Sequence, residues 1–268
     1  MRLALVARLA LSAPCFYDRK RVFMQKLRIV HMYPELLNLY GDSGNMLVLA
    51  HRLTQRHIPF EIVEVNVGDT PSLSSADLVF IGGGSDREQK IVCSALQTIR
   101  NELASYVEDG GVLAAVCGGY QLLGHYYLLG DEKVKGLSLV DLYTDRGTPR
   151  LIGNIAIKSS ICTHPIVGYE NHGGRTYLGS GITPLGVVEY GHGNDGKSGY
   201  EGCLYKHVLG TYIHGPLFPK NPGVADFLLR TACVRRGICQ TLEPLDDTIE
   251  LQANNVMYQR LMNHEIHE

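Results

Sequence analysis

The chain has 268 residues, 45 % of them hydrophobic and 19 % charged, which is the composition of a globular protein with a sizeable core. Its formal net charge of −2 at pH 7 gives no electrostatic basis for binding nucleic acid or an anionic membrane, and no apolar run has the length of a membrane span. The seven cysteines form no CxxC pair, which excludes a zinc ribbon or a thioredoxin-like motif and favours mostly inert thiols in a reducing cytoplasm.

The first 23 residues differ in character from the rest of the chain. This segment resembles a signal peptide, because Arg2 is followed by a short apolar stretch and Ala13 lies near a possible cleavage site. However, Arg8 interrupts the apolar stretch, and a basic run follows it. Met24 stands immediately before the first convincing strand. We therefore expect residues 1–23 to lie outside the fold, as a mis-set translation start or a disordered extension.

Between residues 26 and 145, strand-like and helix-like segments alternate. Apolar or period-2 runs predict strands at 26–33, 60–67, 76–84 and 111–119. Helical spacing predicts helices at 41–57, at 86–110 as one long helix, and at 120–129. This alternation predicts an α/β fold with a mostly parallel sheet and helices on both faces.

After about residue 145 the pattern changes. Strand-like runs at 151–159, 184–193 and 202–215 are joined by glycine-rich loops, which predicts a more antiparallel second half. Two further helices are predicted at 221–237 and 246–268. We interpret the chain as a domain of residues 24–237 followed by a C-terminal helical tail, residues 238–268.

Cys117 stands between an apolar strand and a pair of glycines. A thiol in such a strand-to-helix turn can adopt the strained geometry of a nucleophile elbow, and the following helix would lower its pKa and offer amides to an oxyanion. His214 ends another predicted strand, so it would meet Cys117 at the same sheet edge and act as its base. The alternatives are a buried structural cysteine and a turn histidine that has no partner.

Several motifs together resemble a known family. "GVLAAVCGGYQLLG" (111–124), "FIGGGSD" (80–86) and "GTYIHGP" (210–216) are similar to class I glutamine amidotransferases of the cobyric acid synthase branch. "YGDSGN" (40–45), "FIGGGSDREQ" and "VGYENHGGRTYLG" (167–179) narrow the resemblance to the GatD family, the glutaminase subunits of lipid II isoglutaminyl synthase. The resemblance runs from about Lys26 to Gly237 and implies a flavodoxin-like class I amidotransferase fold.

The resemblance also implies a role for individual residues. Cys117 would attack the side-chain amide of glutamine, and His214 would activate the thiol and protonate the departing ammonia. The remaining assignments are an oxyanion hole at the backbone of Gly83, Gly84 and Gly118, and substrate binding by Arg150 and Gln121. The guanidinium of Arg150 suits this role, because a guanidinium can bind the carboxylate of a substrate bidentately. The alternatives are a solvated loop charge for Arg150 and a helix cap for Gln121.

The chain departs from the family pattern beyond the histidine. Most class I amidotransferases carry a glutamate two residues after it, where this chain has Pro216. The site is then a Cys–His dyad, or it takes a carboxylate from elsewhere. Asp42 is one candidate, although a helix N-cap is an alternative role for it. An acidic residue of a partner protein is the other candidate.

The stretch 170–179 and its surroundings also contain potential metal ligands. His164, His172 and His192 have spacings that fit no common zinc pattern, and Glu170 and Asn171 add little. We therefore expect no metal site, and interpret the stretch as a structural or interface loop near the active site.

The resemblance implies a complete function. The chain would hydrolyse glutamine through a Cys117 thioester and supply ammonia, as one half of a heterodimer, to a Mur-ligase-like (MurT type) partner. That partner would convert the D-glutamate of the lipid II stem peptide to D-isoglutamine, in the cytoplasm or at the inner face of the membrane. No glycine run has the Lys-Ser/Thr ending of a P-loop, so we expect ATP and Mg on the partner and no cofactor here. The alternatives are a cobyric-acid-synthase-type amidotransferase and a non-catalytic scaffold subunit.

Overall fold

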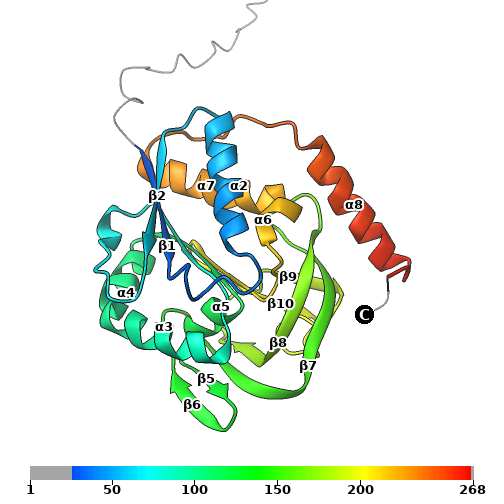
Figure 1. Cartoon of the computed structure of the whole chain (residues 1–268). Coiled ribbons are helices and arrows are strands. Elements are labelled where there is room, and N and C mark those ends of the chain that lie inside the picture. Colours follow the sequence, from blue (N-terminus) through cyan, green and yellow to red (C-terminus); the bar gives the residue numbers. More distant parts are fainter. Residues whose placement is uncertain (1–25, 267–268) are drawn as a thin grey trace, which may run out of the picture.

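The computed structural model describes residues 26–266 and contains two sheets of six strands each (Figure 1). The first sheet has the order β11-β12-β4-β3-β1-β2. Its strands are β1 (Leu27–Met32), β2 (Phe60–Val65), β3 (Leu78–Ile81), β4 (Val112–Val116), β11 (Cys203–Tyr205) and β12 (Val208–Thr211). All neighbours in it are parallel except β11 and β12, which confirms the predicted mostly parallel sheet.

The central strands are apolar throughout because both faces of the first sheet are covered. Every residue of β3 and β4 is buried. Helices α2 (Ser43–Gln55) and α7 (Pro222–Arg236) lie together over one face, and α3 (Asp86–Thr98) and α4 (Arg100–Glu108) lie on the other side (Figure 1). A 3₁₀ turn, η1 (Leu73–Ser75), precedes β3 and contacts α4.

Two predicted helices differ from the structure. The segment 86–110 forms two helices, because the backbone leaves helical geometry at Ile99 (φ −110°, ψ 12°) and its amide binds the carbonyl of Leu96. The segment 120–129 is helical only as far as Leu122, where α5 (Gly118–Leu122) ends. Its remainder forms β5 (Tyr126–Leu129), which pairs with β6 (Glu132–Lys135) as a hairpin.

The second sheet is mostly antiparallel, which confirms the prediction for the second half. It contains β5 and β6 together with β7 (Leu142–Lys158), β8 (Ile166–Leu178), β9 (Gly186–Tyr190) and β10 (Tyr200–Glu201). The prediction that 170–179 is a loop is wrong, because residues up to Leu178 belong to β8. Glycines in this stretch hide its strand character in the sequence, while pairing along β7 stabilises it, for example His172 opposite Leu151.

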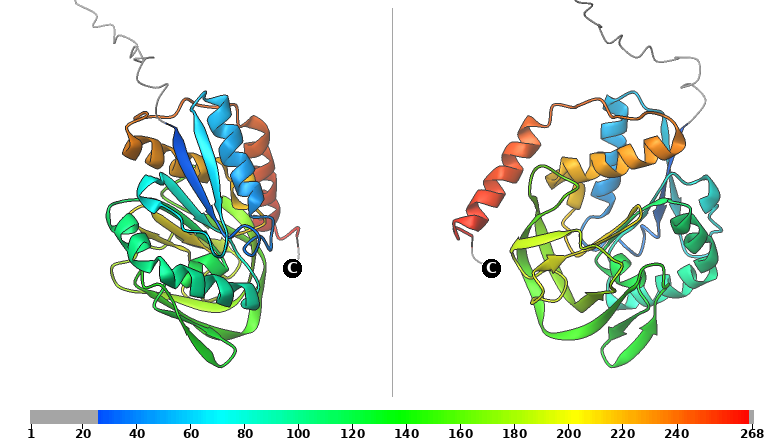
Figure 2. Two further views of the ribbon diagram at one scale, coloured as in Figure 1. Left: turned by 60° about the vertical axis from the view of Figure 1, so that its left-hand side comes forward. Right: turned by 180° about the vertical axis from the view of Figure 1, so that it is seen from behind.

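The C-terminal helix α8 (Thr248–Met262) lies at the edge of the molecule beside the second sheet (Figures 1 and 2). It contacts β7, β8, β9 and the short helix α6 (Leu217–Lys220). The buried amide of Asn254 donates hydrogen bonds to the carbonyls of Pro165 and Lys220 at 3.0 Å each. The predicted tail therefore contains a helix docked on the domain, and the predicted extension of residues 1–23 lies outside the described residues.

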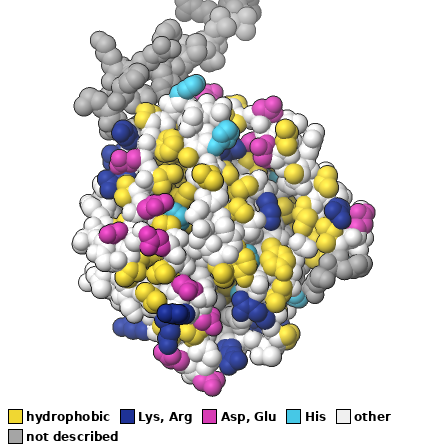
Figure 3. All heavy atoms as spheres, in the orientation of Figure 1, with side chains coloured by type: hydrophobic (Ala, Val, Ile, Leu, Met, Phe, Trp, Pro, Cys, Tyr) yellow, Lys and Arg dark blue, Asp and Glu magenta, His cyan; other side chains and the backbone are white. Residues whose placement is uncertain are grey.

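The surface of the described residues agrees with the near-neutral net charge of the sequence. On the face seen in Figure 3, acidic and basic side chains are interspersed with hydrophobic ones. Among residues 26–266, no helix is both long enough and apolar enough to cross a bilayer.

Candidate active site

Cys117 occupies a strained turn between β4 and α5. Its φ of 50° and ψ of −106° lie outside the common regions for a residue with a side chain. Two neighbouring segments hold this conformation: the Cys117 amide donates to the carbonyl of Thr211 at 2.8 Å, and the Gly119 amide donates to that of Gly82 at 3.1 Å. A Cβ on Gly119 would lie only 2.7 Å from the carbonyl oxygen of Ile81, so a glycine is required for this close approach.

The thiol of Cys117 is almost inaccessible, with 8 % of the residue exposed. Burial raises its pKa to about 12, the Asp42 carboxylate adds to the rise, and Arg150 and the Gly118 amide oppose it. The first amide of the helix lowers this pKa as expected, but the expectation of a lowered pKa overall is wrong. Helix α5 has only five residues, and loss of water around the thiolate outweighs its terminal amides. The thiol is protonated at neutral pH, so a nucleophilic role requires a base.

His214 lies at the same edge of the first sheet as Cys117. Strands β12 and β4 are parallel with Thr211 opposite Val116, so the chain continues from both strands at one carboxyl edge. The imidazole of His214 is fully buried, and neither of its nitrogens has a hydrogen-bond partner among residues 26–266. Burial lowers its pKa to about 3, with further contributions from His172, Lys220 and Arg150. His214 is therefore neutral, which is the form that accepts a proton.

Asp42 has neither of the roles considered for it. Its carboxylate makes no capping bond to α2 and no bond to the nitrogens of His214 within the described chain. Instead it accepts a 2.8 Å hydrogen bond from the Gly83 amide and a 3.4 Å bond from the side chain of Asn45. Burial raises the pKa of Asp42 to about 6, although the Gly83 bond opposes this rise. The carboxylate thus fixes the glycine turn beside Cys117.

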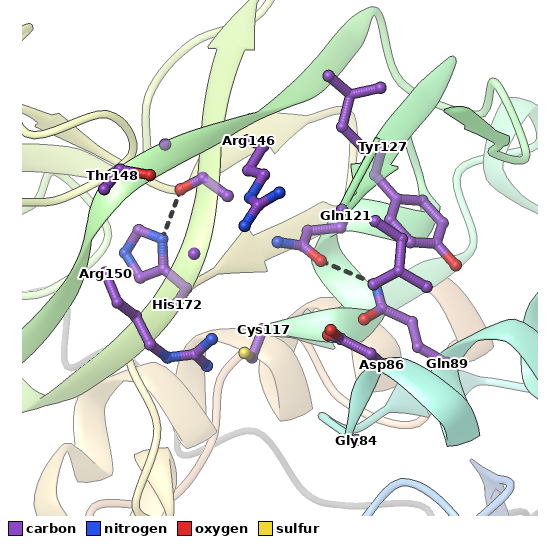
Figure 4. A pocket seen from close by; sticks show the side chains of 16 residues that line it. Gly84, Asp86, Gln89, Cys117, Gln121, Tyr127, Arg146, Thr148, Arg150 and His172 are labelled. Carbon is purple, nitrogen blue, oxygen red and sulfur yellow. Dashed lines mark hydrogen bonds between the residues drawn. The ribbon is translucent and has the colours of Figure 1, made fainter. Parts of the chain in front are cut away.

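A cavity of about 370 Å³ opens beside the thiol (Figure 4). Arg150, on β7, lines it and points its guanidinium toward Cys117. The side chain of Asn171 accepts a 2.5 Å hydrogen bond from Arg150 Nε, and the Asn171 carbonyl accepts a 2.9 Å bond from Nη2. Arg150 is therefore an exposed residue held in the wall of the cavity, at the irregularity of β7 between Arg146 and Leu151.

Gln121 lines the same cavity from α5. Its amide oxygen accepts a 2.8 Å bond from Gln89, and its amide nitrogen donates to the Tyr212 hydroxyl at 3.1 Å. These side-chain bonds fix the amide in the cavity wall, so it does not serve as a helix cap. Sequence reasoning missed Gln89, which the motif "FIGGGSDREQ" contains but whose role becomes visible only when α3 is placed beside α5.

His172 also belongs to this cavity, although the sequence suggested it only as a metal ligand. Its ring stacks on Tyr212 at 3.6 Å between centroids, and its Nδ1 lies 2.8 Å from the Gly174 carbonyl. Burial lowers its pKa to about 3. The Glu170 carboxylate accepts hydrogen bonds from backbone amides, including that of Gly193 at 2.9 Å. Among residues 26–266, no three His, Cys, Asp or Glu side chains are grouped to hold a metal ion.

Two comparisons with known proteins agree on the kind of domain, and a third shows a similar fold. Residues 28–222 match the model of the CobB/CobQ-like glutamine amidotransferase domain. Subunit GatD of lipid II isoglutaminyl synthase (glutamine-hydrolyzing) from Staphylococcus aureus (strain N315) is 43 % identical over 238 residues, which cover 88 % of this chain and 97 % of that protein. Its namesake from Streptococcus pneumoniae (strain ATCC BAA-255 / R6) is 37 % identical, over 79 % of this chain and 82 % of that protein. The crystal structure of SMU.1228c has a similar fold, with a TM-score of 0.51, 16 % identity, and coverage of 88 % of this chain and 100 % of that one.

Proposed function

The chain belongs to the CobB/CobQ-like glutamine amidotransferases, and on this premise we propose that it is the glutaminase subunit of a lipid II isoglutaminyl synthase. The family membership expected from the sequence motifs is thereby confirmed, as is glutamine-dependent amidotransferase chemistry. The 43 % identity to GatD over 97 % of its length supports the narrower assignment. The observation that carries the chemistry is the strained Cys117 turn, which faces the Arg150 guanidinium across one cavity.

In the proposed reaction, glutamine enters the cavity with its α-carboxylate on Arg150 and its side-chain carbonyl carbon at the Cys117 sulfur. His214 accepts the thiol proton while the C–S bond forms, and this proton then leaves with the amide nitrogen as ammonia. Water, activated by the same imidazole, hydrolyses the thioester to glutamate. Gln121 contributes to the wall that orients the substrate.

The oxyanion of the tetrahedral intermediate needs backbone donors beside the sulfur. The Gly118 amide is already directed at the thiol, where it opposes the rise in pKa. The Gly83 amide donates to Asp42 in this structure, so its participation requires that this bond be exchanged for the oxyanion. Gly84 follows in the same turn, and we assign it the second donor position.

We assign the ammonia to an ATP-dependent Mur-ligase-like (MurT type) partner, which binds Mg and amidates the D-glutamate of the lipid II stem peptide. The heterodimer would act in the cytoplasm, at the membrane face where lipid II is exposed. Because Pro216 stands where a carboxylate is usual, we assign a third catalytic group to that partner.

Glutamate release from glutamine tests this proposal. The purified chain is measured alone and with its co-expressed partner, for the wild type, Cys117→Ala and the control Cys162→Ala. Cys162 is also a thiol whose pKa burial raises to about 12, but it lies away from the cavity. We expect Cys117→Ala to abolish turnover, Cys162→Ala to retain it, and the partner to stimulate it.

Two outcomes would contradict the proposal. Absence of turnover in both settings would favour the scaffold alternative, with Cys117 as a core thiol. Turnover that supports amidation of a cobyric acid precursor, but not of lipid II, would favour the cobyric-acid-synthase-type alternative.

A further inference from the structure

Tyr40 lies on a loop that two hydrogen bonds fix against the glycine turn of the active site. The loop connects β1 to α2. On one side of Tyr40, the Leu39 amide donates to the Gly83 carbonyl at 3.1 Å. On the other side, the Asp42 carboxylate accepts the Gly83 amide at 2.8 Å. A residue held between two bonds to the same glycine has a defined position relative to Cys117, which the Gly83 turn approaches closely.

The ring of Tyr40 stacks flat on the imidazole of His214. The ring centroids are 3.8 Å apart and the planes differ by 16°. Tyr169 contacts the same imidazole with its ring at 61° and a centroid distance of 6.0 Å. Neither imidazole nitrogen has a hydrogen-bond partner within residues 26–266, so contacts with ring faces orient the imidazole. A flat stack fixes the plane of the ring and leaves both nitrogens free for proton transfer.

The stack also bears on the charge that His214 acquires. An imidazolium here would lie near three groups on three different elements, His172 on β8, Lys220 on α6 and Arg150 on β7, all of which disfavour a positive charge. The face of an aromatic ring is electronegative and attracts a cation. Tyr40 presents this face to His214, and thereby opposes the three groups when the thiol proton arrives.

The hydroxyl end of Tyr40 reaches the substrate-binding side of the site. Partial burial raises the pKa of Tyr40, and the thiol of Cys117 adds to the rise, whereas the nearby guanidinium of Arg150 opposes it. The ring of Tyr40 is thus in contact with the base, and its hydroxyl lies beside the group assigned to the substrate carboxylate. Substitution by phenylalanine removes the hydroxyl alone, whereas substitution by leucine removes both the hydroxyl and the aromatic ring.

We infer that Tyr40 is a positioning residue, which orients and stabilises the His214 imidazole through its ring and supports Arg150 through its hydroxyl. Within this chain the ring contacts orient the imidazole, since Pro216 stands at the position where a carboxylate is usual. This role of Tyr40 rests on the proposed function, because it assigns His214 as the base. Since the ring makes the decisive contact, phenylalanine at position 40 should preserve the behaviour of the base, and leucine should not.

The test compares Tyr40→Phe and Tyr40→Leu with the wild type in the complex with the partner, with Tyr143→Leu as the control. Tyr143 is also a stacked tyrosine, but it lies on the second sheet and outside the cavity. We expect Tyr40→Leu to lower kcat about thirtyfold, the size of a desolvated cation–π contact of about 2 kcal/mol, and to shift the acidic limb of the pH–rate profile to lower pH with the imidazole. Tyr40→Phe should keep kcat and the pH profile and raise KM for glutamine. Tyr143→Leu should match the wild type.

A second measurement separates this inference from the proposed function. The pKa of His214 is followed by NMR titration of its ring protons in the chain alone, where no turnover is needed. We expect Tyr40→Leu to lower this pKa further and Tyr40→Phe to leave it unchanged. An unchanged pKa in Tyr40→Leu, or equal kcat losses in Phe and Leu variants, would overturn the inference. A wild-type complex without glutaminase activity would overturn the proposed function, whereas the titration would still show whether Tyr40 controls the imidazole.

Discussion

Replacing Asp42 by asparagine should stabilise the protein relative to the wild type, and this stabilisation should be larger at neutral pH than at acidic pH. In the native protein, burial raises the pKa of Asp42 from 3.8 to about 6. A carboxyl whose pKa rises on folding binds its proton more tightly in the native state, so its contribution to stability is complete below the unfolded pKa and is lost as the pH rises through about 6. A rise of about two units corresponds to about 3 kcal/mol.

Asparagine has a similar shape and can still accept the Gly83 amide, but it does not ionise. The free energy of unfolding of Asp42→Asn minus that of the wild type should therefore grow by up to about 3 kcal/mol between about pH 4 and about pH 8. Urea unfolding at a series of pH values measures this difference. Asp195→Asn is the control, since hydrogen bonds from Ser198 and Lys197 lower the pKa of Asp195, which places its effect below this range. A difference for Asp42→Asn that does not change with pH would refute the reasoning.

The same substitution should affect the thiol. The Asp42 charge is one of the causes that raise the pKa of Cys117, so its removal should lower that pKa and speed alkylation of Cys117 above about pH 6. Mass spectrometry of the alkylated peptide separates Cys117 from the other cysteines. An alkylation rate equal to that of the wild type at every pH would show that the charge of Asp42 does not reach the sulfur.

Three further substitutions test other contacts. Gly119→Ala should destabilise the protein by about 1–3 kcal/mol, because its Cβ would meet the Ile81 carbonyl at 2.7 Å, whereas Gly181→Ala has no atom within 4 Å and should leave the melting temperature unchanged. Arg150→Lys should raise KM for glutamine more than it lowers kcat, since an ammonium cannot bind a carboxylate bidentately; an unchanged KM would argue against the substrate role. Arg52→Ala should cost about 3 kcal/mol in urea unfolding and speed proteolysis of α8, because Asp247 loses its buried guanidinium partner while Asp226 keeps only Arg56; unchanged proteolysis would show that α8 docks without Arg52.

The sequence predicted the features that depend on local pattern. Apolar runs of four or five residues gave the buried strands β3 and β4, and the glycines after Cys117 indicated the sharp turn. Proline near the start and glycine after the end located α7, whose last turn is followed by Gly237 in the left-handed conformation. These signals are contained in neighbouring residues, so no knowledge of the tertiary structure is needed to detect them.

The features that the sequence did not predict depend on contacts between distant segments. The stretch 170–179 reads as a loop until β7 is placed beside it. Asp42 reads as a helix cap until the Gly83 amide, 41 residues away, meets its carboxylate. Tyr40 begins the motif "YGDSGN", but nothing in that motif indicates a contact with a histidine that lies more than 170 residues further along the chain. The pKa of Cys117 was expected in the wrong direction because burial, rather than the adjacent helix, dominates it.

The electrostatics of the proposed Cys117–His214 dyad determine when the proton moves. The pKa of the Cys117 thiol lies at about 12 and that of the His214 imidazole at about 3, so the neutral pair is strongly favoured over a thiolate–imidazolium pair in the chain without substrate. Proton transfer then has to be coupled to formation of the C–S bond, which removes the thiolate as it appears. Arg150 favours the thiolate and disfavours the imidazolium, so a substrate carboxylate bound to Arg150, as proposed, would make His214 a stronger base but would also raise the pKa of the Cys117 thiol. These two effects oppose each other in the transfer, so acceptance of the thiol proton still depends on formation of the C–S bond.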